Sequence, residues 1–231
     1  EALRGVLRPE LRAVGIMGGH GLKRTDPVYR QAAVLGRSLV QAGYYVVTGG
    51  GPGVMEAGNL GAYLGRHSPG ELEEALSLLA RAPHFRDKGY VAAALDVLEA
   101  FPEGLDNLAV PTWFYGHEPS NVFARYIAKY FSNSLREDNL LAVCLHGIVY
   151  CPGSAGTTQE IFQDATQNHY GTFGWYSPMC FLGVQRYRVD TQLFPMLQRL
   201  ARDRPYADML FLSDEPEEIV EFLRSHPPAR V

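Results

Sequence analysis

Lysine is scarce in this chain of 231 residues: of its 21 basic residues only Lys23, Lys88 and Lys129 are lysines, which leaves 18 arginines. None of the three lysines follows a glycine, so the Gly-Lys-Ser/Thr sequence of a P-loop is absent and ATP hydrolysis of that type is excluded. The arginines supply planar side chains that suit bidentate contacts with phosphate or carboxylate.

Cysteine is also scarce. Cys144, Cys151 and Cys180 are odd in number and form no CxxC pair. They lie in apolar, strand-like segments, so we interpret them as reduced core residues. The seven histidines are scattered, with no HExxH motif and no Cys/His cluster at zinc spacing. We therefore expect no metal site.

Strong net charge and long apolar runs are both missing. The formal net charge is −4, so no cationic field attracts a nucleic acid polymer or an anionic membrane. The longest apolar run, residues 140–145, falls far short of the roughly 20 residues that a membrane-spanning helix needs. The first residues lack the pattern of a secretory signal. We expect a cytoplasmic protein.

What the sequence does have is a regular alternation of short apolar runs with longer amphipathic ones, which predicts βαβ units. We expect an α/β fold: a single Rossmann-like domain over residues 1–231 with a doubly wound, mostly parallel sheet. Strands are predicted at about 13–17, 44–48, 108–111, 147–151, 179–184 and 209–213. Helices are predicted at about 27–42, 53–65, 120–136, 157–169, 191–202 and 216–223.

The alternation is interrupted at about residues 66–105, where two helical patterns, 69–82 and 87–100, follow each other. We interpret this stretch as a helical insertion. It is either a solvated flap at the sheet edge or a functional element, namely a lid or a dimer contact. The residues after Arg224 are expected to be a frayed end.

Three glycine-rich segments follow predicted strands: residues 18–21, 48–53 and 152–157. Carboxyl ends of parallel strands form the ligand crevice, and glycine loops there let backbone amides approach a phosphate. Tight turning explains any single loop equally well. No strict GxGxxG and no GxSxG occurs, so neither a dinucleotide-dependent dehydrogenase nor an α/β-hydrolase is indicated.

Two of these segments are similar to motifs of a known family. VVTGGGPGVMEAGNLGA (46–62) and IVYCPGSAGTTQEIFQDA (148–165) resemble the Lonely Guy family of nucleotide phosphoribohydrolases, whose members carry a glycine-triplet loop and a PGGxGTxxE loop. The resemblance implies cleavage of a nucleoside 5′-monophosphate to free base and ribose 5-phosphate, without a cofactor, by a homodimer or higher homo-oligomer. Family members are often mislabelled lysine decarboxylases, but none of the three lysines here lies at a glycine loop.

The resemblance also implies site residues. The catalytic pair maps onto Glu160 and Arg136, with Arg125 as the fallback for the arginine. Two departures are that Ser154 replaces the second glycine of PGG and that the MHERK-like context of the arginine is absent. The predicted contacts to the substrate and its phosphate are Gly18, Gly19, Gly50, Gly51, Gly53, Met55, Gly153, Ser154, Gly156, Thr157 and Thr158.

Both catalytic assignments have alternatives. Thr157 and Glu160 spell an S/T-x-x-E capping box, in which the glutamate would only close a helix turn. Arg136, followed by two acidic residues, could end a solvated helix. The function likewise has two candidates, a phosphoribohydrolase and a non-catalytic module that binds or carries a phosphorylated ligand. Self-association is expected also because the predicted helices 120–136 and 157–169 have long apolar faces.

Overall fold

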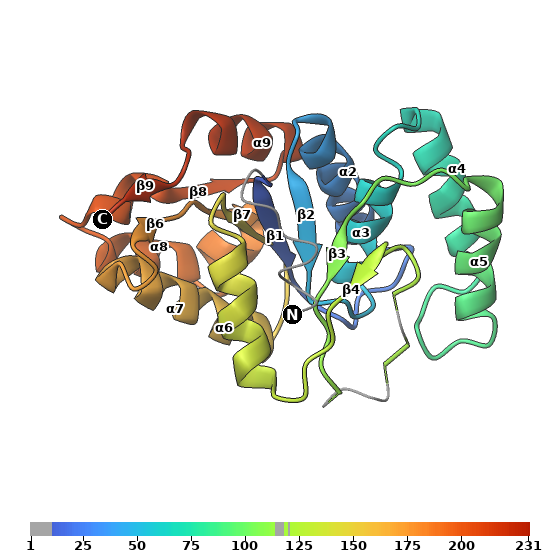
Figure 1. The fold of residues 1–231 in the computed structure, drawn as a ribbon, viewed down its shortest axis with the longest axis horizontal. Helices are drawn as coiled ribbons and strands as arrows, with labels where there is room; N and C mark the ends of the chain where they lie inside the picture. The colour runs from blue at the N-terminus through green and yellow to red at the C-terminus, as the bar shows by residue number, and fades with distance from the viewer. Residues whose placement is uncertain (1–10, 114–117, 120) are drawn as a thin grey trace.

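The computed structural model describes residues 11–113, 118–119 and 121–231. Seven strands of this part of the chain form one parallel sheet in the order β4-β3-β2-β1-β5-β7-β8, which confirms the predicted fold class (Figure 1). Their bounds are β1 Ala13–Met17, β2 Tyr45–Thr48, β3 Leu108–Ala109, β4 Tyr126–Ile127, β5 Ile148–Tyr150, β7 Met179–Leu182 and β8 Leu210–Ser213.

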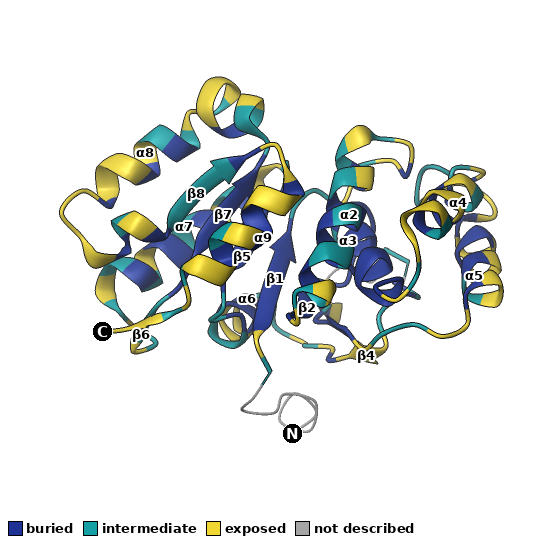
Figure 2. Cartoon of the chain, turned by 90° about the horizontal axis from the view of Figure 1, so that it is seen from above, coloured by how far each residue is buried: buried dark blue, intermediate teal, exposed yellow. Residues whose placement is uncertain are grey.

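Helices cover both faces of the sheet, which explains why every residue of β1, β2, β5 and β7 is buried (Figure 2). Val14 and Ile16 of β1 belong to one apolar cluster, while Ala13 and Met17 belong to the other. The first cluster includes α2 (Pro27–Gln41), α3 (Val54–Tyr63) and α9 (Pro216–Ser225); the second includes α6 (Asn133–Val143), α7 (Ala155–Tyr170) and α8 (Leu193–Leu200).

The strand order fixes where a ligand can bind. From β1 the chain builds outward through β2 and β3 to β4, and it then returns to β5 on the other side of β1. β1 and β5 are therefore neighbours whose following segments run to opposite halves of the sheet. Such a switch point leaves a crevice at the carboxyl ends of the strands. The glycine loops after β1, β2 and β5 all lie at that edge.

The insertion contains the two expected helices, α4 (Pro69–Leu79) and α5 (Tyr90–Ala100), which pack against each other beside α3 (Figure 1). α4 begins with a capping box, in which Ser68 and Glu71 each accept a hydrogen bond from the backbone N–H of the other. α5 turns Ala94 and Val97 towards the core around α3.

The helix predicted over 120–136 is wrong. Tyr126 and Ile127 form edge strand β4, which pairs in parallel with β3, and α6 begins only at Asn133. Their aromatic and β-branched side chains suit a strand, and pairing with β3 overrides the helical spacing. The strand-like interpretation of Cys144 is also wrong, because this residue ends α6.

The carboxyl-terminal segment is not frayed, contrary to expectation. β9 (Ala229–Arg230) pairs antiparallel with β6 (Trp175–Tyr176), and the Arg230 guanidinium lies 5.4 Å from the centroid of the Trp175 ring. Between β7 and β8 the chain forms a π-helix, Gln185–Asp190, then α8 and a 3-10 helix, Pro205–Met209. No helix in the described part of the chain has the length and apolarity to cross a membrane.

Self-association stays a prediction. The apolar face of a 120–136 helix no longer supports it, because that helix does not form. Exposed apolar side chains do occur around β4 and the start of α6. Trp113 stacks on Phe131 with ring centroids 6.1 Å apart, and Ile127 and Leu135 are also exposed. These residues, rather than one helix face, are the candidate contact.

Candidate functional site

Backbone hydrogen bonds hold the three glycine loops together. The Gly19 N–H donates to the Pro152 carbonyl oxygen over 3.0 Å, and the Gly19 carbonyl oxygen accepts from the Val54 N–H over 3.1 Å. The loop after β1 thus joins the start of α3 to the loop before α7. The convergence that the sequence predicted is present in the structure.

Gly53 makes this close approach possible. Its φ is +69°, and a Cβ there would overlap the carbonyl oxygen of Gly19. We expect Gly53→Ala to lower the free energy of unfolding by about 2 kcal/mol or more, because the left-handed conformation and the backbone overlap both oppose a side chain.

Denaturant unfolding measures this effect, and Gly21→Ala is the matched control. A Cβ on Gly21 meets nothing within 4 Å, so that variant should unfold like the wild type. Equal stability of the two variants would show that the loops can separate at little cost.

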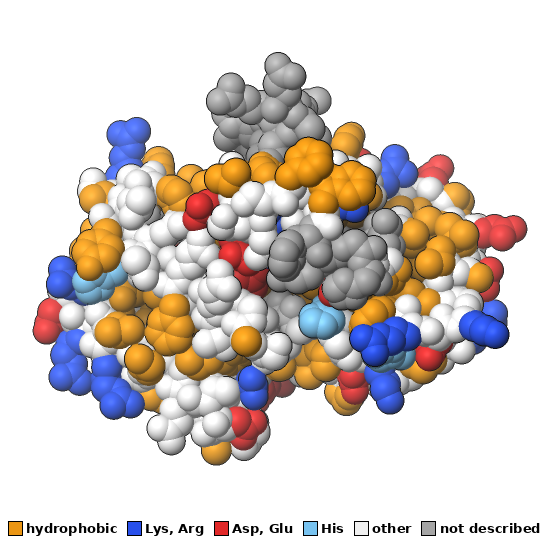
Figure 3. All heavy atoms as spheres, turned by 90° about the horizontal axis from the view of Figure 1, so that it is seen from below, with side chains coloured by type: hydrophobic (Ala, Val, Ile, Leu, Met, Phe, Trp, Pro, Cys, Tyr) orange, Lys and Arg blue, Asp and Glu red, His pale blue; other side chains and the backbone are white. Residues whose placement is uncertain are grey.

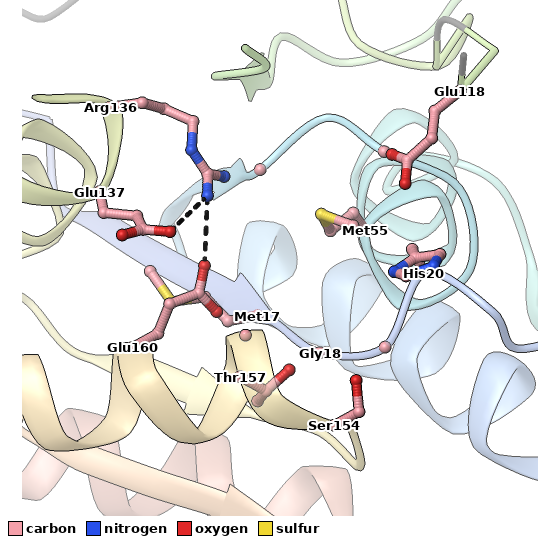
Figure 4. A pocket seen from close by; sticks show the side chains of 14 residues that line it. Met17, Gly18, His20, Met55, Glu118, Arg136, Glu137, Ser154, Thr157 and Glu160 are labelled. Atoms are coloured by element: carbon pink, nitrogen blue, oxygen red, sulfur yellow. Dashed lines mark hydrogen bonds and ion pairs between the residues drawn. The ribbon is translucent and has the colours of Figure 1, made fainter. Parts of the chain in front are cut away.

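A pocket of about 170 Å³ opens at the junction of the loops (Figure 4). Side chains of α6 and α7 form one wall, and the loop after β1 together with the start of α3 forms the opposite one. Of the residues predicted from the sequence, those that line it are Gly18, Gly19, Gly51, Met55, Arg136, Ser154, Gly156, Thr157 and Glu160.

Four predicted contacts are placed elsewhere. Gly50 lines a smaller neighbouring pocket of about 70 Å³. Gly53 and Gly153 lie outside the pocket lining. Gly53 packs closely against the Gly19 backbone, and Gly153 packs closely against the Thr157 side chain. Thr158 also lies outside it: its N–H and its hydroxyl both donate to the Ser154 carbonyl oxygen, each over 3.0 Å.

The first turn of α7 faces the pocket. Ser154 stands at the N-cap position, and its side chain makes no capping hydrogen bond. The first N–H groups of a helix have no partner within the helix, and the helix dipole adds a partial positive charge there. The capping-box interpretation of Glu160 is wrong, because α7 begins at Ala155 and Thr157 therefore lies inside the helix.

Arg136 and Glu160 point towards each other from neighbouring helices (Figure 4). The Arg136 Nη2 lies 3.6 Å from the Glu160 Oε1 and 3.1 Å from the Glu137 Oε1. The solvated interpretation of Arg136 is wrong, because only 6% of the residue is exposed. Arg125, the fallback, lies outside the pocket lining, 3.8 Å from Asp106 at the surface.

The two glutamates beside Arg136 differ in their partners. Glu137 accepts hydrogen bonds from the Asn133 side chain (2.7 Å) and the Gln159 side chain (2.8 Å) as well as from Arg136. Among the described residues, Glu160 has the Arg136 ion pair and no side-chain hydrogen bond. Glu137 is thus held on several sides, whereas Glu160 is free to engage a ligand.

Burial raises the pKa of Glu160 to about 7, since the nearby Arg136 offsets only part of this rise and Glu137 adds to it. One helical turn further, burial also raises the pKa of Asp164 to about 7. Asp164 accepts a hydrogen bond from the Tyr150 hydroxyl over 2.9 Å and does not line the pocket. Two carboxylates of α7 therefore titrate near neutral pH, and one of them faces the cavity.

Three acidic or basic lining residues were not assigned from the sequence: His20, Glu118 and Glu137. His20 lies within the first glycine-rich segment and Glu137 directly follows Arg136, but nothing in their local sequence pattern distinguishes them. Glu118 follows β3 in a loop without a glycine motif, so no sequence signal marked it. Within the described chain, no three His, Cys, Asp or Glu side chains are grouped as metal ligands.

Comparisons with known proteins agree with the fold. Residues 11–66, which carry the first two glycine loops, match the SLOG cluster4 family. The molybdenum cofactor binding protein from the phototrophic bacterium Rippkaea orientalis is 15% identical, with a TM-score of 0.59 over 94% of this chain and 98% of that one. The molybdenum cofactor carrier protein from Chlamydomonas reinhardtii is 15% identical, with a TM-score of 0.58 over 94% and 98% of the two chains.

A search of curated proteins finds no match. The family match covers residues 11–66 of the 231, and the similar solved structures show a shared fold. The matched segment ends before Arg136 and Glu160.

Proposed function

We propose that this protein binds a nucleoside 5′-monophosphate in the pocket and hydrolyses its N-glycosidic bond to free base and ribose 5-phosphate. The observation that carries the proposal is Glu160, a largely buried carboxylate that faces the cavity beside Arg136 and has a pKa of about 7. A general base is most effective when its pKa lies near the working pH.

The phosphate is assigned to the first turn of α7. Unpaired amides, the helix dipole and the hydroxyls of Ser154 and Thr157, which Figure 4 shows at this end of the pocket, suit a tetrahedral anion. A second donor on the α6 side of the pocket also lacks a partner: the buried Nε of Arg136 has no hydrogen-bond acceptor among the described residues. Buried donors are normally satisfied, so a ligand oxygen is the natural acceptor.

The reaction follows from these positions. Cleavage of the glycosidic bond passes through a ribosyl cation with positive charge at C1′. Glu160 takes a proton from water as the water oxygen bonds to C1′, and the electron pair of the C1′–N bond leaves with the base. The base nitrogen takes up one proton from solvent, and Glu160 returns its proton to solvent, which restores the carboxylate. The carboxylate also stabilises the developing cation, and Arg136 orients the sugar hydroxyls.

The 5′-phosphate should be obligatory, because the helix terminus and the loop amides form much of the pocket wall and offer a bare nucleoside few contacts. We expect calorimetry to show AMP binding at least about 100-fold tighter than adenosine, which corresponds to about 2.7 kcal/mol. Comparable affinity for the two compounds would contradict this assignment.

A carrier module is the second candidate, and two observations favour it. Ser154 replaces a glycine of the family loop, and the similar folds described above include proteins named as binding or carrying molybdenum cofactor. A carrier would bind the phosphorylated ligand through the same helix terminus and release it intact. Product analysis distinguishes the candidates, because only the hydrolase yields free base.

A further inference from the structure

The pocket lining has more acidic than basic side chains, which disfavours an anionic ligand. Among the described lining residues, Glu118, Glu137 and Glu160 are acidic, and Arg136 is the only arginine or lysine. Arg136 is already paired with two of these carboxylates. On the face seen from below in Figure 3, Lys and Arg side chains lie mainly towards the two sides of the molecule. A phosphate carries nearly two negative charges, so a further charged or polar donor in the lining would strengthen its binding.

His20 is the remaining lining side chain that can carry a positive charge. It follows the glycines of the first loop, and Figure 4 shows its ring beyond Gly18, across the cavity from Arg136 and Glu160. An imidazole offers at least one N–H donor in either protonation state. Its position lets it approach an anion at the start of α7 from the opposite side.

The helical insertion supports this ring. Phe85, in the loop between α4 and α5, packs edge-on against His20 with ring centroids 6.3 Å apart. His84 stacks on the same phenyl ring with its centroid 4.6 Å away. The loop thus supplies an aromatic contact to a side chain that is otherwise exposed.

A buried ion pair fixes the loop in this place. The Arg24 side chain donates to both carboxylate oxygens of Glu56, over 2.6 and 2.9 Å, and to the Tyr90 carbonyl oxygen over 2.9 Å. The Arg24 N–H donates to the Pro83 carbonyl oxygen, also over 2.9 Å. Both ends of the 84–89 segment are therefore tied to Arg24, four residues after His20. The Tyr90 hydroxyl also donates to Glu56, which is next to the lining residue Met55.

We propose that His20 binds the phosphate of the ligand and that Phe85 is a positioning residue that orients its ring. The insertion then completes the anion site and is not merely a solvated flap. This inference rests on the proposed function only in taking a phosphorylated ligand; it does not require that the ligand is cleaved.

The test compares binding of AMP, ribose 5-phosphate and adenosine by calorimetry. We expect His20→Ala to weaken AMP and ribose 5-phosphate by the same factor, about tenfold, and to leave the weak binding of adenosine unchanged, because a charge-assisted hydrogen bond is lost only with the phosphorylated ligands. His20→Gln keeps an N–H donor and should bind AMP with about a third of the wild-type affinity. Phe85→Leu should weaken AMP binding by about threefold.

His226→Ala is the matched control, because this histidine also stacks on a phenyl ring, that of Phe222, but does not line the pocket; it should bind AMP like the wild type. Unchanged AMP affinity in His20→Ala, an equal loss with adenosine, or no binding of AMP and ribose 5-phosphate by the wild type would overturn the inference. If AMP is bound through His20 but never cleaved, the inference stands and hydrolysis fails. If AMP is cleaved with the same KM by His20→Ala, only the inference fails.

Discussion

Replacement of Glu160 by glutamine is expected to lower the turnover number by about 100-fold or more, a rise in the barrier of about 2.7 kcal/mol. The amide keeps the size of the side chain but can neither take a proton from water nor stabilise a ribosyl cation by charge. AMP binding should be largely retained, because the phosphate contacts lie one turn earlier in α7. Steady-state release of base, with calorimetry for binding, measures both quantities.

Asp164→Asn is the matched control for this variant. Asp164 is a second buried carboxylate of α7 with a pKa raised to about 7, but it lies outside the pocket lining. We expect wild-type turnover to rise between pH 6 and pH 8 as Glu160 loses its proton, and Asp164→Asn to keep this profile. A profile that disappears in Asp164→Asn, or near-normal turnover in a folded Glu160→Gln protein, would assign the reaction to another group.

Arg136→Ala is expected to destabilise the protein by about 3 kcal/mol at pH 8. The Arg136 guanidinium is buried between Glu137 and Glu160, and removal of one partner from a buried ion pair leaves uncompensated charge. The loss should be smaller at pH 6: the folded-state pKa of Glu160 is raised to about 7, so below that pH this carboxylate is mostly neutral and needs no cation.

Urea unfolding at the two pH values tests this expectation, with Arg125→Ala as the control. Arg125 is exposed and lies 3.8 Å from Asp106, so its removal should change the free energy of unfolding by less than about 1 kcal/mol. Equal effects of the two substitutions, or an Arg136→Ala effect that does not change with pH, would mean that Arg136 does not balance the buried glutamates. The alternative drawn from the sequence, a solvated helix end at Arg136, would instead predict little effect of this substitution on stability.

The sequence predicts the sheet well because its signals are local. Buried parallel strands such as β1 and β5 are short apolar runs, and glycines follow them wherever loops must approach closely. The switch point then brings the three loops together without any further information. Glu160 and Arg136 could be proposed only through the family motifs, since their spacing along the chain says nothing about their distance in space.

The errors concern contacts that join distant segments. Pairing with β3 converts Tyr126 and Ile127 from an expected helix into a strand, and pairing of β9 with β6 orders the expected frayed end. The burial of Arg136 depends on α6 lying against α7, which no periodicity in either helix reveals. His20 becomes notable only when the insertion places Phe85 beside it.

Product analysis tests the central claim most directly. The wild-type protein is incubated with AMP, GMP, CMP and isopentenyladenosine monophosphate, and free base and ribose 5-phosphate are quantified by chromatography, with Glu160→Gln run in parallel. The account predicts that at least one nucleotide yields base and ribose 5-phosphate in equal amounts, and that this release falls by about 100-fold or more in the variant. Binding of these nucleotides with no release of base from any of them would contradict hydrolysis and identify a protein that holds its ligand intact.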